Sequence, residues 1–273
     1  MPADLHCHTK LSDGSTCLED IITLAKYSKL SAISITDHDT FAGTVRGQVL
    51  GNRVGVKVVN GIELSAFDFK RGRKVHLLAY MCASPDRLRG LCHQTAANRK
   101  KAASEILQKL IRVYPITPDM VTRTATGSTN IFKQHIMHTL MNAGYATEIF
   151  GATYEKLFAP KHGLCAVEPE YPDIFTVLEL VHSAGGISVL AHPSAYDSME
   201  LLPELIEAGL AGVEVWHPRN TEEDTETLQK IAIDKKLIMT GGTDFHGMYT
   251  KNILRLGTYT TPDKQLSRIL ERK

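Results

Sequence analysis

Short apolar runs rich in β-branched residues recur along the chain and alternate with stretches of amphipathic pattern. Runs of this length that are bounded by polar or turn residues predict buried strands. We expect parallel strands at residues 32–36, 56–59, 75–80, 187–191, 212–216 and 237–240.

Helical periodicity fills several of the gaps between these runs. Thr16 and Glu19 have the spacing of a capping box, which predicts a helix that begins there and continues to about Lys29. Further helices are expected at residues 173–184, 199–208 and 222–235. Strands that alternate with helices indicate βα units around a parallel sheet, either open or closed.

The alternation stops between residues 87 and 166, where no strand is predicted. A long helix is expected at 91–113, with Ile106, Leu107, Leu110 and Ile111 on one face. A second helix is expected at 131–143, because Gly144 has the character of a helix C-terminus. This pattern therefore indicates a helical insertion into the βα series.

The composition is that of an ordinary globular protein, with 273 residues of which 43% are hydrophobic and 22% charged. The sequence contains no run of about 18 apolar residues and no signal peptide, so a cytoplasmic protein without a membrane partner is expected. The five cysteines are widely spaced and odd in number, which indicates reduced thiols.

The net charge of +1 conceals an asymmetry along the chain. Residues 70–133 contain thirteen lysines and arginines but three acidic residues, whereas the remainder is acidic. A basic middle segment suits an anionic substrate, although a solvated helix surface would explain it equally well.

Histidines and carboxylates lie next to many of the expected strands. In an extended chain His6 and His8 point to the same side, and Asp244 and His246 repeat this spacing. The full set of candidate ligands is His6, His8, Asp13, His38, Glu63, His76, His192, Asp244 and His246.

Each of these residues alone could have a structural role, since a lone histidine at a strand end is more often hydrogen bonded than metal bound. Their recurrence changes this interpretation, because the carboxyl ends of strands in βα folds converge on one rim. So many ionisable groups cannot be packed together without compensating charge, which divalent cations supply. A mixture of imidazoles and carboxylates suits Zn, Mn or Fe better than Ca.

The ordered motifs resemble the PHP (polymerase and histidinol phosphatase) family. They are DLHCHT (4–9), SDG (12–14), TDHD (36–39), GIE (61–63), VHLLAY (75–80), AHP (191–193), GVEVWHP (212–218) and TDFH (243–246). The resemblance implies an α/β fold, a distorted (β/α)7 TIM-like barrel. The barrel would comprise residues 1–86 and 167–273, and residues 87–166 would form an inserted helical subdomain that caps the substrate.

The resemblance also implies two or three divalent ions. One would be bound by His6, His8, Glu63 and Asp244; a second by Glu63, His76 and His192; and a third by Asp13, His38 and His246. Glu63, His192 and Asp244 would be the catalytic residues among these ligands. Some branches of the family have a histidine in place of Asp13, and the aspartate makes Mn or Mg possible at the third site.

Within the family, the insertion resembles that of enzymes acting on small nucleotides, namely 3′,5′-nucleoside bisphosphate phosphatases and short-RNA 5′→3′ exonucleases. Their Arg-Pro-His-Ile motif is matched here by residues 133–136, which keep the histidine but have Lys-Gln in front of it. The expected partner is a small phosphorylated nucleotide or short oligoribonucleotide, without long duplex DNA or an obligate protein partner. The candidate substrate contacts are Arg99, Lys133, His135 and Arg219.

The predicted activity is metal-dependent hydrolysis of a phosphate ester by a hydroxide generated at the ions. Asp4, Asp37 and Asp39 are expected to orient ligand imidazoles. One alternative is a phosphatase for histidinol phosphate or another small metabolite. Another alternative, from a different class, is a non-catalytic module that binds metal or nucleic acid.

Overall fold

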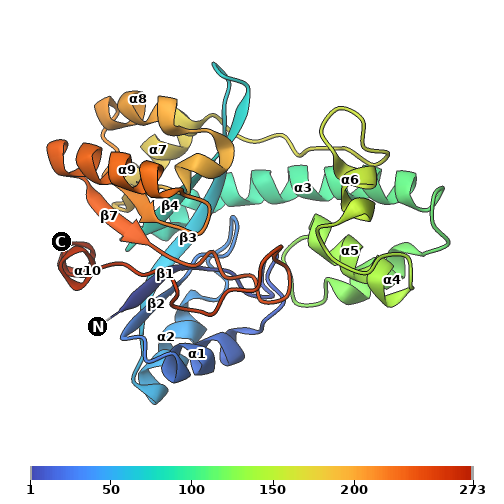
Figure 1. Ribbon diagram of the computed structural model, residues 1–273, viewed down its shortest axis with the longest axis horizontal. Helices are drawn as coiled ribbons and strands as arrows, with labels where there is room; N and C mark the ends of the chain where they lie inside the picture. The colour runs from blue at the N-terminus through green and yellow to red at the C-terminus, as the bar shows by residue number, and fades with distance from the viewer. Residues whose placement is uncertain (1, 272–273) are drawn as a thin grey trace.

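The computed structural model of the chain describes residues 2–271, and its centre is a seven-stranded sheet in which the strands follow their order in the chain. The strands are β1 (Ala3–Cys7), β2 (Ala32–Ile35), β3 (Lys57–Asp68), β4 (Arg73–Tyr80), β5 (Ile187–Leu190), β6 (Gly212–Trp216) and β7 (Ile238–Gly241). The edge strands β1 and β7 contact each other, and Cys7 pairs with Phe245 just after β7. The sheet therefore curls into a nearly closed barrel, which confirms the predicted fold class (Figure 1).

All six apolar runs form strands, but β4 is antiparallel to both of its neighbours, so its prediction as a parallel strand was wrong. β3 and β4 are joined through a short turn at residues 69–72. A parallel connection needs a crossover of a dozen or more residues, so this turn permits only a hairpin. β3 is also longer than predicted, and Glu63 consequently lies within the strand instead of following it.

Within the described residues, six α-helices pack against the barrel, and Figure 1 shows α1 and α2 on one side of the sheet and α7, α8 and α9 on the other. Their bounds are α1 (Leu18–Tyr27), α2 (Thr44–Val54), α7 (Ile174–Ser183), α8 (Leu202–Glu207), α9 (Glu222–Asp234) and α10 (Asp263–Leu270). Short 3₁₀ helices are η1 (Pro85–Leu88), η2 (Pro193–Tyr196) and η3 (Met199–Leu201). The helix expected at 199–208 is thus divided between η3 and α8.

Two helix predictions failed in detail. The capping box at Thr16 is absent, because α1 begins after Cys17, which makes no side-chain capping bond. α2 was not predicted, since Gly47 and Gly51 lower its intrinsic helix propensity. A Cβ atom at Gly51 would lie 2.4 Å from the carbonyl oxygen of Val56, so glycine allows α2 to pack closely on the chain entering β3.

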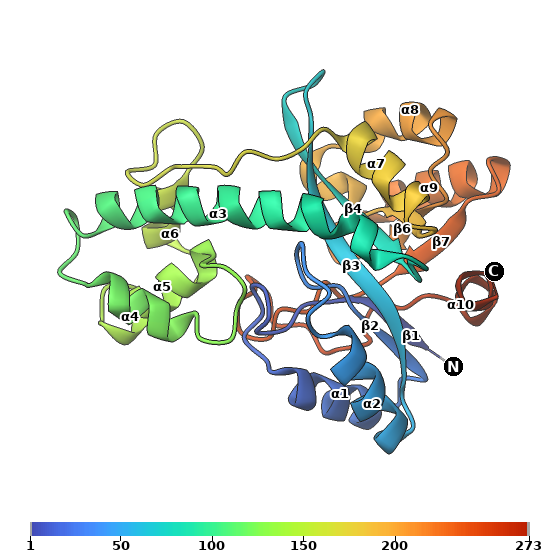
Figure 2. The same ribbon diagram turned by 180° about the vertical axis from the view of Figure 1, so that it is seen from behind.

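Residues 87–166 form four helices: α3 (Arg89–Leu110), α4 (Pro118–Thr124), α5 (Lys133–Asn142) and α6 (Ala152–Phe158). Figure 2 shows α3 extending away from the barrel, with the other three helices gathered beside its distal half. Ile106 and Leu110 are buried in an apolar cluster shared with α5 and α6, whereas Ile111 is 45% exposed and does not belong to the buried face. The division of the chain at residues 86 and 166 remains a prediction.

The barrel itself has an apolar interior to which alternate residues of the strands contribute, including Leu5, Val59, Leu78 and Val189. A second apolar cluster joins the outer face of the sheet to α7, α8 and α9. All five cysteines are unpaired thiols, as predicted. Among the residues that the structure describes, none of the helices combines the length and apolar character needed to cross a bilayer.

Candidate active site

The ends of the parallel strands bring distant motifs together. His6 is in β1 and His8 follows it, while Asp244 and His246 follow β7. A bridge between Cys7 and Phe245 aligns these two segments in parallel, with the His8 N–H donating to the Phe245 carbonyl at 2.8 Å. The two pairs with i, i+2 spacing are therefore placed side by side at one end of the barrel.

The backbone is strained at several of these strand ends. His192 has a φ of 25°, Asp244 a φ of 51° and Asp39 a φ of 55°, all in the left-handed region. Non-glycine residues in this region cost on the order of 1–3 kcal/mol each and cluster at functional sites. Two of these residues, His192 after β5 and Asp244 after β7, are candidate ligands.

Four side chains converge in what we call the first cluster, defined as His6, His8, Glu63 and Asp244. The Nε2 atom of His6 lies 3.4 Å from Glu63 Oε2 and 3.5 Å from Asp244 Oδ1. The Nε2 atom of His8 lies 3.1 Å and 3.3 Å from the same two oxygens. Two donor atoms about 2.1 Å from one ion at the tetrahedral angle are separated by about 3.4 Å, so this spacing suits a shared divalent cation.

Glu63 joins this cluster to a second group of histidines. Its Oε1 atom lies 2.8 Å from Nδ1 of His76 and 2.9 Å from Nε2 of His192. Its Oε2 atom, which faces the first cluster, also lies 3.3 Å from Nδ1 of His38. One carboxylate thus contacts imidazoles on both of its oxygens, which is the arrangement expected of a bridging ligand.

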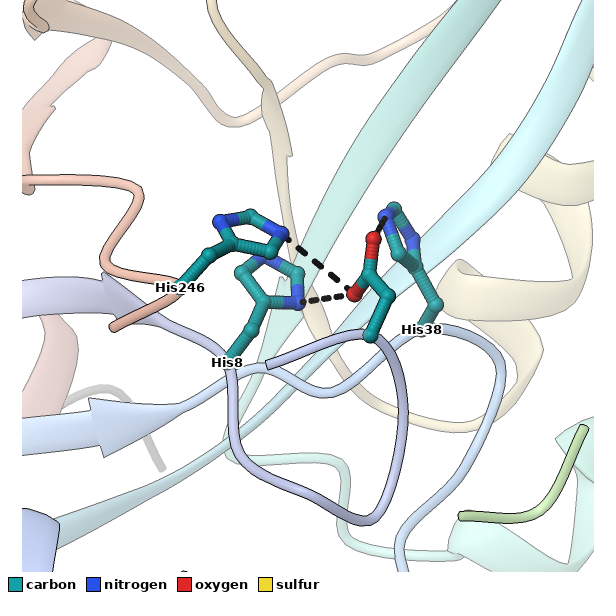
Figure 3. Close-up of side chains that lie close together, drawn as sticks. His8, His38 and His246 are labelled. Carbon is teal, nitrogen blue, oxygen red and sulfur yellow. Dashed lines mark ion pairs between the residues drawn. The ribbon is translucent and has the colours of Figure 1, made fainter. Parts of the chain in front are cut away.

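A third group surrounds Asp13. Figure 3 shows the rings of His8, His38 and His246 around a carboxylate, and this carboxylate belongs to Asp13. Its Oδ1 lies 3.3 Å from His246 Nε2 and 3.6 Å from His8 Nδ1, and its Oδ2 lies 3.8 Å from His38 Nε2. The His38 ring therefore stands between the groups of Glu63 and Asp13.

The donor set fits divalent cations. Buried ring nitrogens of His6, His8, His38 and His192 have no hydrogen-bond partner among the described residues. Unpaired polar atoms in a protein interior carry a large free-energy cost, which coordination to a cation removes. Imidazoles mixed with carboxylates favour transition metals over Ca²⁺.

The carboxylates of the site are ionised. Burial by itself would raise the pKa of Glu63, but the surrounding imidazoles, led by His38, outweigh it and hold this pKa well below its usual value. The pKa values of Asp13 and Asp244 are also well below normal, because His246 and neighbouring histidines outweigh the effect of burial. The site thus offers carboxylate oxygens with negative charge and imidazole nitrogens to a bound cation.

Asp4, Asp37 and Asp39 hold the backbone and neighbouring side chains instead of ligand imidazoles, in contrast to the prediction. Asp37 accepts hydrogen bonds from the Thr9 N–H and hydroxyl, both at 2.7 Å. Asp4 accepts bonds from the N–H and hydroxyl of Thr243 at 3.0 and 2.6 Å. These carboxylates fix the loops that present the ligands.

A cavity of about 170 Å³ lies beside the clusters, and its lining includes Asp13, His38 and His76 together with three cationic side chains. These cations are Lys74 from β4, Arg99 from α3 and Lys133 from α5. A larger cavity of about 640 Å³ shares the first three residues and extends toward Arg219 and residues 249–254. Cations and candidate metal ligands therefore line the same depression.

The predicted substrate contacts differ in their surroundings. Arg99 is buried and bound to Asp39, while Lys133 is paired with Glu168 on the rim of the smaller cavity. Arg219 is exposed on the lining of the larger cavity. His135 lines neither cavity, because its ring is buried and its Nδ1 accepts the Phe132 N–H at 3.1 Å, capping α5.

Two residues near the clusters were not predicted. Glu214, which belongs to the motif at residues 212–218, is fully buried and contacts the His6 ring. Gln134 donates from Nε2 to Asp13 Oδ2 at 2.9 Å. A glutamate inside an apolar strand run was the one signal in the sequence that could have indicated Glu214.

Known proteins resemble this chain over most of its length. A family model for the PHP domain matches residues 4–123. A phosphoribosyl 1,2-cyclic phosphate 1,2-diphosphodiesterase from Eggerthella lenta is 37% identical over 251 residues, which cover 91% of this chain and 95% of that protein. A 5′-3′ exoribonuclease from Haemophilus influenzae is 28% identical over 250 residues and 89% of each chain.

A crystal structure from Bifidobacterium adolescentis, whose assignment as a metal-dependent phosphoesterase is itself provisional, superimposes with a TM-score of 0.91 and 31% identity. The match covers 100% of this chain and 98% of that one, so the helical segment is matched together with the barrel. These similarities and the histidine–carboxylate clusters show that the chain is a hydrolase that belongs to the PHP family of metal-dependent phosphoesterases.

Proposed function

We propose that this enzyme hydrolyses a phosphate ester of a small ribose phosphate that carries a second phosphate group. Bisphosphorylated nucleosides and 5′-phosphorylated short RNAs belong to this class, as does the phosphoribosyl cyclic phosphate for which the Eggerthella lenta relative is named. The observation that carries the proposal is the cavity that Lys74, Arg99 and Lys133 share with candidate metal ligands.

The nine histidines and carboxylates are proposed to hold two or three divalent cations, either Mn, Zn or Fe, with Mg possible beside Asp13. The first cluster would bind one ion, Glu63 with His76 and His192 a second, and Asp13 with His38 and His246 a third. Bound there, such ions would activate water and neutralise charge on the phosphate that is cleaved. The unpaired ring nitrogens and the donor spacing of the first cluster support this assignment.

The cationic cavity would bind the phosphate that is not cleaved. Lys74 and Lys133 are both paired with Glu168, whose side chain is 46% exposed. A phosphate dianion carries more charge than this carboxylate and can bind both ammonium groups at once. Arg99 is held by Asp39 through Nε and Nη2, and its Nη1 points toward the Tyr171 hydroxyl at 3.5 Å. Lysines at the rim and an oriented guanidinium would therefore recognise a second anionic group.

Residues 87–166 are proposed to act as a substrate-capping subdomain. α3 and α5 supply Arg99, Lys133 and Gln134 to the lining of the smaller cavity. These helices also share their own apolar cluster, separate from those of the barrel. The segment would consequently determine which substrates reach the metal ions.

A nucleotide is favoured over a bare sugar phosphate by one feature of the larger cavity. Its lining includes the partly exposed aromatic side chains of Phe150 and Tyr259, and its volume is about 640 Å³. Aromatic faces stack on nucleobases with little dependence on base identity. A base could therefore occupy this space while the second phosphate reaches the cationic cavity.

The proposal is tested by steady-state kinetics of the Mn²⁺-loaded enzyme on four phosphate esters. They are a phosphoribosyl 1,2-cyclic phosphate, 3′,5′-bisphosphorylated adenosine, a 5′-phosphorylated trinucleotide and histidinol phosphate. We expect turnover of at least one of the first three to exceed that of histidinol phosphate, and Glu63→Gln to abolish it. Comparable or faster hydrolysis of histidinol phosphate would refute the assignment of the substrate class.

The role of the cationic cavity is tested separately with Lys133→Met. This change should raise KM for the preferred substrate and leave KM for p-nitrophenyl phosphate, which has a single phosphate, unchanged. Lys100→Met is the matched control, because Lys100 is an exposed lysine of α3 that does not line the cavity. Equal effects of Lys133→Met on both substrates would argue against a second-phosphate site.

A further inference from the structure

The motif at residues 212–218 supplies none of the nine candidate ligands, but two of its side chains lie directly behind the first cluster. Glu214 is in β6 and is fully buried. Its Oε1 lies 2.9 Å from Nδ1 of His6, and its Oε2 accepts the backbone N–H of His192 at 2.8 Å. Both contacts are made to residues that carry candidate ligand rings.

The contact with His6 determines where that ring carries its proton. An ionised carboxylate can only accept, so Nδ1 of His6 must be the protonated nitrogen. The other nitrogen, Nε2, is then free to donate its lone pair, and it is the atom that faces Glu63 at 3.4 Å and Asp244 at 3.5 Å. Glu214 thereby selects the tautomer and the ring orientation that a metal ligand requires.

His217 stands in a similar relation to Asp244. Its Nδ1 accepts the backbone N–H of Arg219 at 3.1 Å, which places the proton of the neutral ring on Nε2. That Nε2 lies 3.5 Å from Oδ2 of Asp244. The opposite oxygen, Oδ1, is the one that faces His6 and His8. At this distance Nε2 makes no hydrogen bond, but it faces the oxygen of Asp244 that is turned away from His6 and His8.

We propose that Glu214 and His217 are positioning residues for a divalent cation at the first cluster, with Glu214 orienting His6 and His217 orienting Asp244. The proposal rests on the metal assignment above but does not depend on which phosphate ester is hydrolysed. The end of β6 would thus supply the outer layer of the metal site, while β1, β3 and the segment after β7 supply its ligands.

A purely structural role explains these contacts less well. Removing a carboxylate from water costs several kcal/mol, and an apolar residue of similar volume would pack in the strand without this cost. The partners of Glu214 are the ring of His6 and the backbone N–H of His192. Its burial is therefore compensated at the ligand residues and not by the surrounding apolar core.

The test measures Mn²⁺ affinity of the metal-free protein by competition with a chromophoric chelator. Glu214→Gln should weaken binding about 10- to 100-fold, the usual effect of losing such a partner. The amide nitrogen of glutamine cannot accept, so it must oppose either the His6 Nδ1–H or the His192 N–H. Asp68→Asn is the matched control, because Asp68 is a buried carboxylate paired with Arg71 at the distant end of β3.

His217 provides a second, independent pair of variants. His217→Gln can place an amide N–H near the position of Nε2 and should retain affinity within about threefold of the unmodified protein. His217→Ala removes the donor and should weaken Mn²⁺ binding about tenfold or more. Circular dichroism of each metal-free variant establishes that it is folded, and if Glu214→Gln does not fold, the His217 pair decides the question.

Unchanged Mn²⁺ affinity in Glu214→Gln, or equal affinities of His217→Ala and His217→Gln, would overturn the proposal. An equal loss in Asp68→Asn would also overturn it, since the effect would then reflect general destabilisation. These affinities are measured without substrate, so failure of the proposed substrate class leaves them unaffected. Absence of Mn²⁺ binding in the unmodified protein would instead contradict the metal assignment itself.

Discussion

Replacing Arg99 with methionine should destabilise the metal-free protein by about 3 kcal/mol, because it leaves the carboxylate of Asp39 buried without its cation. The two side chains are 10% and 2% exposed and are joined at 3.0 Å. They connect α3 to the loop after β2. The substitution therefore tests whether this pair attaches the helical segment to the barrel.

The expected loss of stability in Arg99→Met follows from the contacts around Asp39. Breaking a buried ion pair by removal of one partner costs roughly 3–5 kcal/mol. The lower end applies here, because Ser65 still donates to Asp39 from its N–H at 2.9 Å and its hydroxyl at 3.0 Å. Methionine retains an aliphatic stem beside Phe132, whose ring centroid lies 4.8 Å from the guanidinium carbon.

The assay is urea unfolding of the metal-free protein, followed by circular dichroism, for Arg99→Met, Asp39→Asn and the double variant. Because the two groups interact directly, the double variant should be more stable than the sum of the single losses predicts, by about 2 kcal/mol. Lys100→Met, an exposed neighbour on α3, should change stability by less than about 0.5 kcal/mol. A loss below about 1 kcal/mol for Arg99→Met, or strictly additive effects, would refute the reasoning.

Three further predictions concern the site and its surroundings. A Cβ at Gly242 would lie 2.4 Å from the Cβ of His6, so Gly242→Ala should lower the free energy of unfolding by about 1–3 kcal/mol and weaken Mn²⁺ binding. Gly90→Ala is the control and should have neither effect, because a Cβ at Gly90 would meet no atom within 4 Å. Burial lowers the pKa of His135 to about 4. The neutral ring therefore stabilises the folded state above the unfolded pKa near 6.5, and this stabilisation is lost as the pH falls from 6.5 toward 4. His135→Asn, which keeps an acceptor for the Phe132 N–H, should flatten the dependence of urea midpoint on pH in this range; an unchanged slope would contradict it. Removal of metal with a chelator should abolish turnover, and Mn²⁺ at 100 times its Kd should stabilise the folded protein by about 2.7 kcal/mol; equal melting temperatures with and without metal would contradict this.

The sequence alone predicted much of the barrel and the candidate ligands. Strands buried on both faces are nearly continuous apolar runs, so their positions could be identified without knowing their partners. His6 with His8 and Asp244 with His246 are local patterns with a spacing of two residues, and such spacing has a geometric meaning in any extended chain. The nine candidate ligands are accordingly side chains whose chemistry is visible in short motifs.

Tertiary structure decided the direction of strands, the contacts behind the ligands and the shape of the substrate cavity. β4 is antiparallel because a short turn precedes it, although its apolar pattern is that of a parallel strand. Gly47 and Gly51 disfavour a helix locally, but the close packing of α2 against the chain entering β3 requires a glycine at position 51. Glu214 and His6 are 208 residues apart, and their contact exists only because the barrel brings the two strands together. The local sequence indicates the chemistry of a side chain. The residue that it contacts depends on which distant segment of the chain the closed sheet places beside it.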